Sequence, residues 1–332
     1  MSVERPCELW PGAAPNGETV PRVVVFDASP SFDRQHKQRG GKPMPKLRLR
    51  RLGRTGLLVT ELGFGAANVA AAPEGEEALL RAFALGVNFV ETGRIYRGSE
   101  YMIGVALNQL PDQGASVHVA SKTIGRSRDA ALRDLERSLE HLGLPKVDIY
   151  QLVDVRRHDW GQVMAPGGAL EGLREAQERG LVRYVGISSH SHQVLRQAIE
   201  SGEFDTVQLR YNVFNLRNEE LIRLARRKDI GVIVMKPLGG FGMAGALKAF
   251  RHWDRLNAKT LLCYVLSNRH LSVAIPGMRF PWEVEENVSL ALTYKVMTSS
   301  EKARLREDAE AYLAESAAPT APASGGPGSP SA

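Results

Sequence analysis

Cysteine is almost absent from this 332-residue chain: Cys7 and Cys263 are the only two, and they lie far apart in the sequence. A disulfide-stabilised scaffold is therefore excluded, and a reducing compartment fits the composition better. No CxxC motif occurs, so the usual ligand spacing of zinc and iron–sulfur sites is missing as well. We expect no metal in this protein.

Long hydrophobic runs are also lacking. Between Met1 and Pro30 there is no apolar stretch of the length that a secretory signal peptide requires. No segment of the chain approaches the roughly 20 apolar residues of a membrane-spanning helix. We therefore expect a cytoplasmic protein that has no membrane as a partner.

Neither sign of charge dominates the sequence. The chain has 43 Lys and Arg residues against 37 Asp and Glu residues, which gives a formal net charge of +6. Because no dense stripe of basic residues is interleaved with aromatic residues, we do not expect nucleic acid as a partner. Hydrophobic residues make up 43% of the chain, which is enough for a large folded core.

The two ends of the chain differ in composition from its middle. Residues 1–46 are rich in Pro, Gly and charged residues apart from the apolar run Val23–Phe26, so we expect a poorly ordered extension with at most one short strand. Residues 316–332 are mainly Ala, Pro, Ser and Gly and should form a disordered tail. The folded domain is predicted to span residues 47–315.

Strand-like and helix-like patterns alternate within this domain. Eight short apolar runs are bounded by turn residues, at 61–65, 88–91, 117–122, 147–152, 182–188, 206–211, 231–235 and 272–276. They are apolar on both faces, as buried parallel strands are. Helical periodicity lies between them, for example in the stripe of Leu132, Leu135, Leu139 and Leu142.

This alternation predicts an α/β fold in which eight strand–helix units close into a (β/α)8 TIM barrel. The segment Leu47–Thr60, with Gly53-Arg54-Thr55-Gly56 between two alternating stretches, predicts an N-terminal β-hairpin. A doubly wound open sheet is the alternative, but no G-x-G-x-x-G motif follows an early strand.

Reactive groups of such barrels lie at the carboxyl ends of the strands. The second predicted strand ends at Glu91 and is soon followed by Tyr96, and the third ends at Lys122. A buried Lys beside a Tyr stabilises the phenolate, so we expect the Tyr96 pKa to be lowered from about 10 toward the working range. Such a Tyr can act as general acid toward a carbonyl oxygen, with Glu91 holding Lys122 charged. A structural ion pair beside a surface Tyr is the alternative.

Several segments between Leu47 and Leu292 resemble the aldo/keto reductase family. They are Leu52-Gly53-Arg54-Thr55-Gly56-Leu57, Thr92 to Glu100, Val147-Asp148-Ile149-Tyr150-Gln151-Leu152, Gly186-Ile187-Ser188-Ser189, Met235-Lys236-Pro237-Leu238-Gly239-Gly240 and Ile275-Pro276-Gly277-Met278-Arg279. The block from Pro166 to Asp205 most resembles a bacterial branch whose members often carry a C-terminal iron–sulfur module, which this sequence lacks. The resemblance implies an oxidoreductase that uses NADPH/NADP+ and a small-molecule substrate.

The family's catalytic set is Asp, Tyr, Lys and His. Tyr96 and Lys122 match it, whereas Glu91 stands at the Asp position and Val153 at the His position. The family's His donates a hydrogen bond to the substrate carbonyl, and Val has no donor. Losing one such donor costs on the order of 3 kcal/mol in the transition state. His190, just after the fifth strand, is the nearest candidate to replace it; a solvated loop His is the alternative.

The nicotinamide end of a cofactor is expected at three strand ends. The hydroxyls of Ser188 and Ser189 could bond the carboxamide, with help from Gln208 on the next strand. Met235 stands where the family usually places an aromatic residue under the nicotinamide ring, and it offers a polarisable sulfur contact instead.

The phosphate and adenine end is expected at the last two strands. Lys236 could meet the pyrophosphate together with backbone amides, and Arg279 could pair bidentately with a 2′-phosphate, which favours NADPH over NADH. A solvated Arg and an ordinary first helical turn are the alternatives for Arg279 and the adenine contacts. The further residues of this group are Leu238, Gly239, Gly277, Glu286 and Asn287.

Three functions remain open from the sequence. The first is an NADPH-dependent reductase of a small carbonyl or conjugated compound, with Tyr96 as proton donor. The second is a catalytically weak barrel that binds a nucleotide or metabolite. The third is a lyase or isomerase that reuses Tyr96 and Lys122 for acid–base chemistry without net redox change.

Overall fold

The structure, a computed structural model, describes residues 46–112, 114–239 and 255–317. The predicted N-terminal extension lies outside the described residues except for Lys46, and so do residues 318–332 of the predicted tail. The last helix, α12 (Ser299–Ala317), continues past the predicted start of that tail at residue 316. In the described part of the chain, no helix is long and apolar enough to cross a membrane.

Parallel strands roll into a barrel, and each pairs with the next along the chain. They are β3 (Phe64–Gly65), β4 (Phe89–Glu91), β5 (His118–Thr123), β6 (Val147–Leu152), β7 (Val182–Ser188), β8 (Thr206–Arg210), β9 (Gly231–Met235) and β10 (Val273–Ile275). Backbone bonds join the first strand to the last: Gly63 N donates to Ala274 O and Gly65 N donates to Pro276 O, both at 2.9 Å. The predicted (β/α)8 barrel is confirmed.

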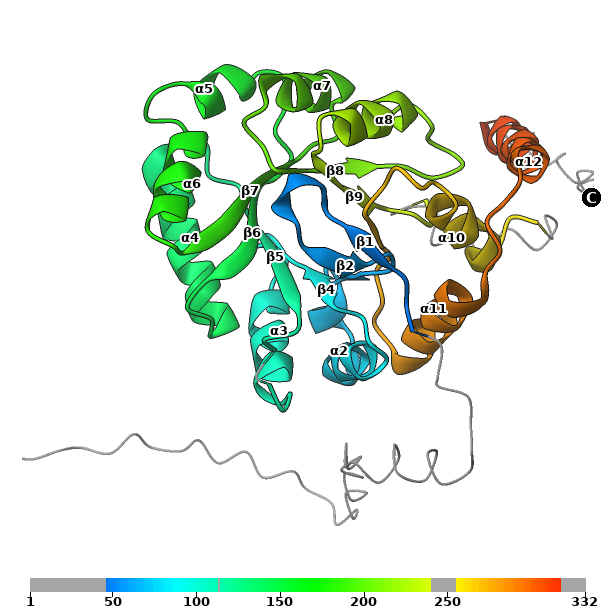
Figure 1. Ribbon diagram of the computed structural model, residues 1–332, viewed down its shortest axis with the longest axis horizontal. Coiled ribbons are helices and arrows are strands. Elements are labelled where there is room, and N and C mark those ends of the chain that lie inside the picture. The colour runs from blue at the N-terminus through cyan, green and yellow to red at the C-terminus, as the bar shows by residue number, and fades with distance from the viewer. Residues whose placement is uncertain (1–45, 113, 240–254, 318–332) are drawn as a thin grey trace, which may run out of the picture. The chain divides into compact units, whose positions relative to one another are not determined.

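Helices surround the strands, as Figure 1 shows. They are α2 (Gly75–Ala84), α3 (Ser99–Asn108), α4 (Arg128–Leu142), α5 (Trp160–Met164), α6 (Ala169–Glu178), α7 (His192–Ser201), α8 (Glu219–Arg227), α10 (Ala258–Leu266), α11 (Pro281–Thr293) and α12, with a 3-10 turn η2 (Val69–Ala71). Helix α4 illustrates the local causes. The Ser127 side chain caps its first turn by accepting a bond from Ala130 N, Leu132 and Leu135 are buried, and Gly143 ends it in the left-handed conformation.

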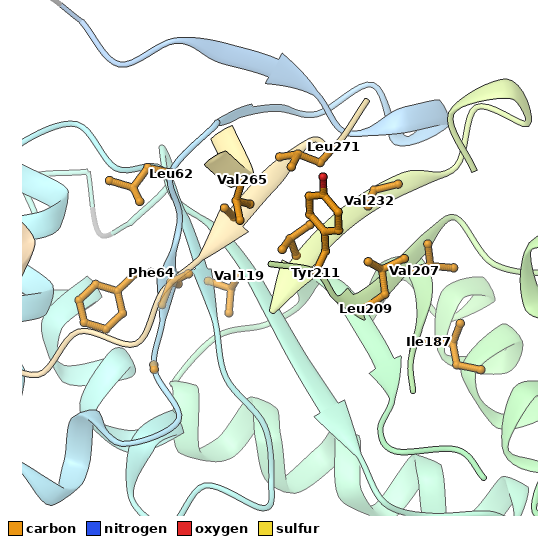
Figure 2. Close-up of a cluster of buried hydrophobic side chains, with 14 of the residues drawn as sticks. Leu62, Phe64, Val119, Ile187, Val207, Leu209, Tyr211, Val232, Val265 and Leu271 are labelled. Atoms are coloured by element: carbon orange, nitrogen blue, oxygen red, sulfur yellow. The ribbon is translucent and has the colours of Figure 1, made fainter. Parts of the chain in front are cut away.

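The larger hydrophobic core lies between the strands and these helices. Figure 2 shows part of it, including Leu62 and Phe64 at the first strand and Val207 and Leu209 on β8. Tyr211, directly after β8, belongs to the same cluster. Fully burying each such side chain contributes roughly 1.5–3 kcal/mol, so this layer dominates the stability of the barrel.

The predicted hairpin is also confirmed. Strands β1 (Leu49–Arg51) and β2 (Leu58–Thr60) pair antiparallel around a short 3-10 turn, η1 (Gly53–Thr55). Gly53 has a φ of +52°, and a Cβ there would lie 2.2 Å from the backbone nitrogen of Gly231, so only glycine fits. Figure 1 shows the hairpin lying across the centre of the barrel.

The hairpin seals the amino-terminal end of the barrel interior. Its apolar side chains pack on the inward-facing residues of the strands in a second core cluster, which contains Leu52, Leu57, Val59, Phe89, Ala120, Ile149, Ile233, Val273 and Ile275. The described side chains of this cluster are apolar, so the polar side chains of a site are to be sought at the carboxyl end of the barrel.

One buried ion pair ties the hairpin to the rest of the barrel. Arg50 Nη2 lies 2.5 Å from Glu61 Oε2, and the Glu61 side chain is fully buried. Arg50 also donates to the backbone oxygens of Leu266, Asn268 and Leu271, at 2.7, 3.0 and 3.2 Å. The segment that links α10 to β10 is thus held by one guanidinium.

Candidate active site

A layer of polar side chains occupies the carboxyl end of the barrel interior. Glu91 is the last residue of β4, and Lys122 and Gln151 lie side by side in the register of β5 and β6. Gln208 comes from β8. All four are at most 2% exposed, so burial places ionisable and amide groups in a medium of low dielectric where their pairing decides their state.

Lys122 is the centre of this layer. Its ammonium forms an ion pair with Glu91 and donates to the backbone oxygen of Thr92 at 2.5 Å. The same nitrogen lies 4.6 Å from the centroid of the Tyr96 ring. The structure therefore brings together Glu91, Tyr96 and Lys122, the three residues that the sequence singles out for catalysis.

The segment between β4 and α3 holds Tyr96 in place. Tyr96 N donates to Gly93 O at 2.9 Å, and Thr92 Oγ1 bonds Ser99 Oγ at 2.8 Å across the loop. A Cβ at Gly93 would lie 3.3 Å from Lys122 Cβ, so glycine allows the loop to approach the lysine. The Tyr96 hydroxyl bonds to none of the residues that the structure describes, which leaves its proton available to a ligand.

The expectation that Lys122 lowers the Tyr96 pKa is wrong for this structure. Burial raises the pKa of Tyr96 well above its ordinary value, and the nearby charge of Glu91 raises it further. The physical reason is that the Lys122 ammonium is already paired with Glu91, so the phenolate would meet a nearly neutral pair in a desolvated site. Tyr96 is consequently protonated throughout the neutral range.

The Lys122 pKa moves in the opposite direction. Burial lowers it, and the charge and hydrogen bond of Glu91 oppose that effect, with a smaller contribution of the same sign from Glu100. Glu100 lies near because its Oε1 accepts a bond of 2.6 Å from Ser121 Oγ, while its Oε2 pairs with Arg94 at 2.9 Å. The charged form of Lys122 thus depends on the carboxylates around it.

A chain of amides supports Glu91 from the other side. Gln208 Nε2 donates to Glu91 Oε1 at 2.8 Å, and Gln151 Nε2 donates to Gln208 Oε1 at 2.8 Å. The polarity of this chain follows from Glu91, because an ionised carboxylate only accepts and must face an NH2 group. Gln151 Oε1 is left buried without a partner among the described residues. The predicted contact between Gln208 and a carboxamide stays a prediction. In this structure the side-chain nitrogen of Gln208 already donates a hydrogen bond to Glu91.

The position of the family's His is occupied by a buried apolar side chain. Val153 is 6% exposed at the end of β6, and its backbone N donates to Thr123 O at 3.0 Å. The next residue, Asp154, has a φ of +49°, a conformation that costs energy for a residue other than glycine. Arg126 Nη2 donates to the backbone oxygens of both residues, at 2.9 and 3.1 Å, and so supports this strained strand end.

His190 lies exposed at the end of β7. Desolvation lowers its pKa, and the charges of Lys236 and Arg210 lower it further against the opposing effect of Asp154. The neutral ring that results at neutral pH retains one N–H donor. Two other histidines near strand ends have different surroundings: His158 is largely exposed, and His192 bonds Asn218 and Glu220.

The two serines predicted for the carboxamide are not equivalent. Ser189 Oγ donates to Val155 O at 2.7 Å and accepts a bond from Ser191 N at 2.9 Å, so its hydroxyl is already used in a turn. The Ser188 side chain makes no hydrogen bond to a described residue. Of the two, Ser188 is therefore the one whose hydroxyl no described residue engages, and its contact with a carboxamide stays a prediction.

Met235 and Lys236 end β9 at the same edge of the barrel. Met235 is partly buried against the interior cluster, and Lys236 has a φ of +55°. Gly239 N donates to Lys236 O at 3.1 Å, so that amide closes a turn, whereas Leu238 N bonds no described residue. Of the two predicted pyrophosphate amides, Leu238 is thus the available one. Gly240 of the same motif lies outside the described residues.

The last predicted group follows β10. Gly277 bridges to Gly65 where the barrel closes. The Arg279 side chain is 52% exposed with one distant carboxylate contact, to Glu283 at 3.8 Å, and is free to reach a ligand. Its backbone N is capped by Glu283 Oε2 at 2.7 Å. Glu286 and Asn287 lie further along α11 and are at least partly accessible.

Sequence reasoning missed two residues of this end. Gln151 is one, and the only sequence signal was a single amide within a buried apolar strand. Arg210, the last residue of β8, is the other: its Nη2 donates to Gly239 O at 2.8 Å, while its buried Nε has no partner among the described residues. A cation at the carboxyl end of a barrel strand is the signal that would have found it.

Comparison with known proteins agrees with this geometry. The model of the aldo/keto reductase family matches residues 61–255. The chain is 28% identical over 287 residues to L-galactose dehydrogenase of Arabidopsis thaliana, covering 74% of this chain and 88% of that protein. It is 24% identical over 326 residues to NADH-specific methylglyoxal reductase of Escherichia coli strain K12, covering 78% and 98%.

Solved structures give the same fold. The holo form of aldo-keto reductase AKR11C1 from Bacillus halodurans superimposes with a TM-score of 0.67 at 21% identity, covering 79% of this chain and 96% of that one. The family match extends over more than half of the chain and includes the strands that carry Glu91, Lys122 and Met235. The chain therefore belongs to the aldo/keto reductase family of oxidoreductases, which act on small molecules with nicotinamide cofactors.

Proposed function

We propose that this chain is an NADPH-dependent reductase of a small carbonyl or conjugated compound, with Tyr96 as proton donor. One observation carries the proposal: the Lys122 ammonium lies 4.6 Å from the Tyr96 ring centroid and is paired with Glu91 at the carboxyl end of the barrel. Barrel enzymes place their reactive groups at this end, and the opposite end is sealed by the hairpin.

Tyr96 supplies the proton. Its raised pKa keeps the hydroxyl protonated at neutral pH, which is the form that a general acid needs. NADPH, when bound, supplies the hydride that reduces the carbonyl carbon. The carbonyl oxygen takes the Tyr96 proton, and the resulting phenolate recovers a proton from solvent. The hydroxyl can do this because no described residue competes for it.

Lys122 positions the Tyr96 ring for this step, because its ammonium lies 4.6 Å from the ring centroid. Its ammonium is held beside the ring by Glu91 and by the Thr92 carbonyl. Gln208 and Gln151 in turn hold Glu91, so we assign both as positioning residues that act through the ion pair. The Glu91 side chain is one methylene longer than that of the family's Asp, and the hydrogen bond from Gln208 fixes its conformation.

The residues at the cofactor edge fit a phosphorylated nicotinamide cofactor. Lys236 pairs with no carboxylate of the described residues, and Arg279 has a single carboxylate contact there, to Glu283 at 3.8 Å. Ser188 and Leu238 retain polar groups that no described residue engages. An exposed Arg279 favours NADPH over NADH, because a guanidinium pairs bidentately with a phosphate. The Escherichia coli relative is named NADH-specific, so NADH is the comparison that this assignment requires.

Val153 favours a second candidate function. A buried valine offers no hydrogen bond to a carbonyl oxygen, and the Tyr96 pKa is raised rather than lowered. Both features weaken turnover of simple carbonyls. A catalytically weak barrel that binds a nucleotide or metabolite is therefore the alternative.

Two measurements separate these functions. Quenching of tryptophan fluorescence by NADPH and by NADH reports binding. Cofactor consumption with a panel of aldehydes, quinones and enones reports turnover, and the names of the relatives add methylglyoxal and, with NADP+, L-galactose. Binding with turnover supports the reductase. Binding without turnover on any member of the panel favours the weak barrel.

A further inference from the structure

A hollow on the flank of the barrel gathers positive charge. It has a volume of about 230 Å³ and lies between α8, the segment from Ser267 to His270 that follows α10, and α12. Figure 1 shows these three helices as neighbours on one side of the barrel. None of the residues that line the hollow belongs to the candidate active site.

Cations outnumber carboxylates in this lining. Arg223, Arg269, Lys302 and Arg306 are four cations, and Glu219 is the one carboxylate among the described residues that line the hollow. Glu219 accepts a bond from Arg223 Nη1 at 3.2 Å and one from Arg306 Nη2 at 3.0 Å. A single carboxylate shared by two arginines neutralises one of them at most, so an excess of positive charge remains.

Many hydrogen-bond donors of these side chains are unused. Arg306 Nε donates to Tyr264 Oη at 2.7 Å, in addition to the bond from its Nη2 to Glu219. The guanidinium thus uses two of its five N–H groups. Lys302 spends one of its three, on Ser267 O at 2.9 Å. The side chains of Arg269 and His270 make no hydrogen bond or ion pair with any residue of the described ranges. The hollow thus presents several N–H donors and few acceptors.

The cations around His270 agree with the excess of positive charge in the lining. Partial burial lowers its pKa, and Arg269, Arg223 and Arg226 lower it further. Each of these three charges opposes a proton on the ring, and no carboxylate contributes in the other direction. An anion in the hollow would relieve this repulsion.

The walls of the hollow are held before any ligand arrives. Arg50 fixes the segment after α10 from the inside through the backbone oxygens of Leu266, Asn268 and Leu271. Met297 N donates to Ser267 Oγ at 2.9 Å and anchors the chain just before α12. Because these contacts already fix the backbone, little of the binding free energy is lost in ordering it.

We propose that this hollow binds a phosphoryl group, either as inorganic phosphate or as the phosphate of a small metabolite. A phosphate monoester carries about −1.5 to −2 charges at pH 7 and several strong acceptor oxygens, which matches a lining rich in unused donors. Arginine pairs bidentately with phosphate. The site is separate from the proposed reductase chemistry, and its test does not depend on turnover.

Titration calorimetry on the full chain tests the proposal. Sodium phosphate and glycerol phosphate are the two probes, and sodium chloride at matched ionic strength is the blank. Arg269→Glu reverses an exposed charge that has no partner among the described residues, so the fold should persist; a melting curve checks this. A phosphate bound at the cofactor edge would not respond to this substitution.

The expected result is saturable binding to the wild-type chain that weakens about tenfold or more in Arg269→Glu, because a like charge replaces an attractive one. Lys302→Met should weaken binding in the same direction. The matched control is Arg137→Glu. Arg137 is an exposed arginine on α4 that does not line the hollow, so this substitution should change the affinity for phosphate by about twofold or less. Tighter binding of glycerol phosphate identifies a metabolite as the ligand, and equal binding identifies inorganic phosphate. Unchanged affinity in Arg269→Glu, or no saturable binding of either probe, overturns the proposal.

Discussion

The two ends of the barrel interior differ in chemistry although the same strands build both. At the amino end, the inward positions of β4, β5 and β6 are Phe89, Ala120 and Ile149. Two residues later on the same strands they are Glu91, Lys122 and Gln151. Because alternate residues of a strand share a face, each strand changes from apolar to polar within one repeat.

The two ends of the barrel therefore contribute different things: the amino end contributes mainly to stability, and the carboxyl end carries the candidate reactive groups. The amino end is closed by the hairpin and contributes apolar burial, which stabilises the barrel. The carboxyl end buries an ion pair whose desolvation is costly, and a chain of amides holds that pair in place. Substitutions at the amino end should therefore lower the free energy of unfolding, whereas substitutions at the carboxyl end should change cofactor affinity or turnover.

The largest effect is expected at the apolar end. Phe89→Ala should lower the free energy of unfolding by about 3–5 kcal/mol, because it leaves a cavity among fully buried side chains. Urea unfolding measures this. The affinity for NADPH, measured below the unfolding transition, should not change. Leu58→Ala, on an exposed hairpin position, is the control and should cost less than about 0.5 kcal/mol. Equal costs for the two substitutions would show that the hairpin does not seal this end.

At the polar end, Arg279→Ala should weaken NADPH binding roughly ten- to hundredfold, the loss expected of a charge-assisted contact. NADH lacks the 2′-phosphate, so its affinity should stay the same. Fluorescence titration with both cofactors provides the measurement, and Arg137→Ala is the matched surface control. Equal weakening of NADPH and NADH would remove Arg279 from the 2′-phosphate site.

A smaller effect is expected from the amide chain. Gln151→Leu removes the donor to Gln208 and loosens Glu91, so turnover should fall roughly tenfold, as for other supporting groups around an active site. The pH profile of turnover should shift because the Lys122 pKa depends on Glu91. NADPH affinity should be preserved. Gln109→Leu, at a surface glutamine bonded to Glu76, is the control. Weaker NADPH binding with unchanged turnover would instead place the amides at the cofactor.

The smallest effect concerns pH. The Tyr96 pKa is raised in the folded state, so the stability that this group contributes is present below the unfolded value near pH 10 and is lost as pH rises above it. Ultraviolet titration of the tyrosines should therefore give the same curve for the wild type and Tyr96→Phe up to about pH 10. A tyrosinate that appears at lower pH in the wild type alone would mean that Lys122 does lower the Tyr96 pKa.

The fold could be predicted from the sequence because it depends on the spacing of apolar residues within each segment and on the turn residues between segments. Both can be read from neighbouring positions in the chain. The strands at 147–152, 182–188 and 231–235 coincide with the observed β6, β7 and β9. The meeting of Glu91, Tyr96 and Lys122 followed from strand ends of a barrel. The direction of the Tyr96 pKa shift could not be predicted in this way, because it depends on burial and on the neutralisation of Lys122 by Glu91.

The parts of the site that escaped prediction depend on contacts between distant strands. In the sequence Gln151 is a single amide in a mostly apolar strand, and only the pairing of β5 with β6 places it beside Lys122. Ser189 and Ser188 look alike in the sequence, yet a bond to Val155 occupies the hydroxyl of Ser189. Such differences appear only once the register and the loop paths are known.

The most direct test of the central claim is Tyr96→Phe, assayed by NADPH consumption on the best substrate of the panel. The ring remains beside Lys122 while the proton is removed, so NADPH affinity should be unchanged and turnover should fall by about 10²–10⁴, the usual span for a general acid. Turnover that survives the substitution would contradict the account, because Tyr96 would then not be the proton donor.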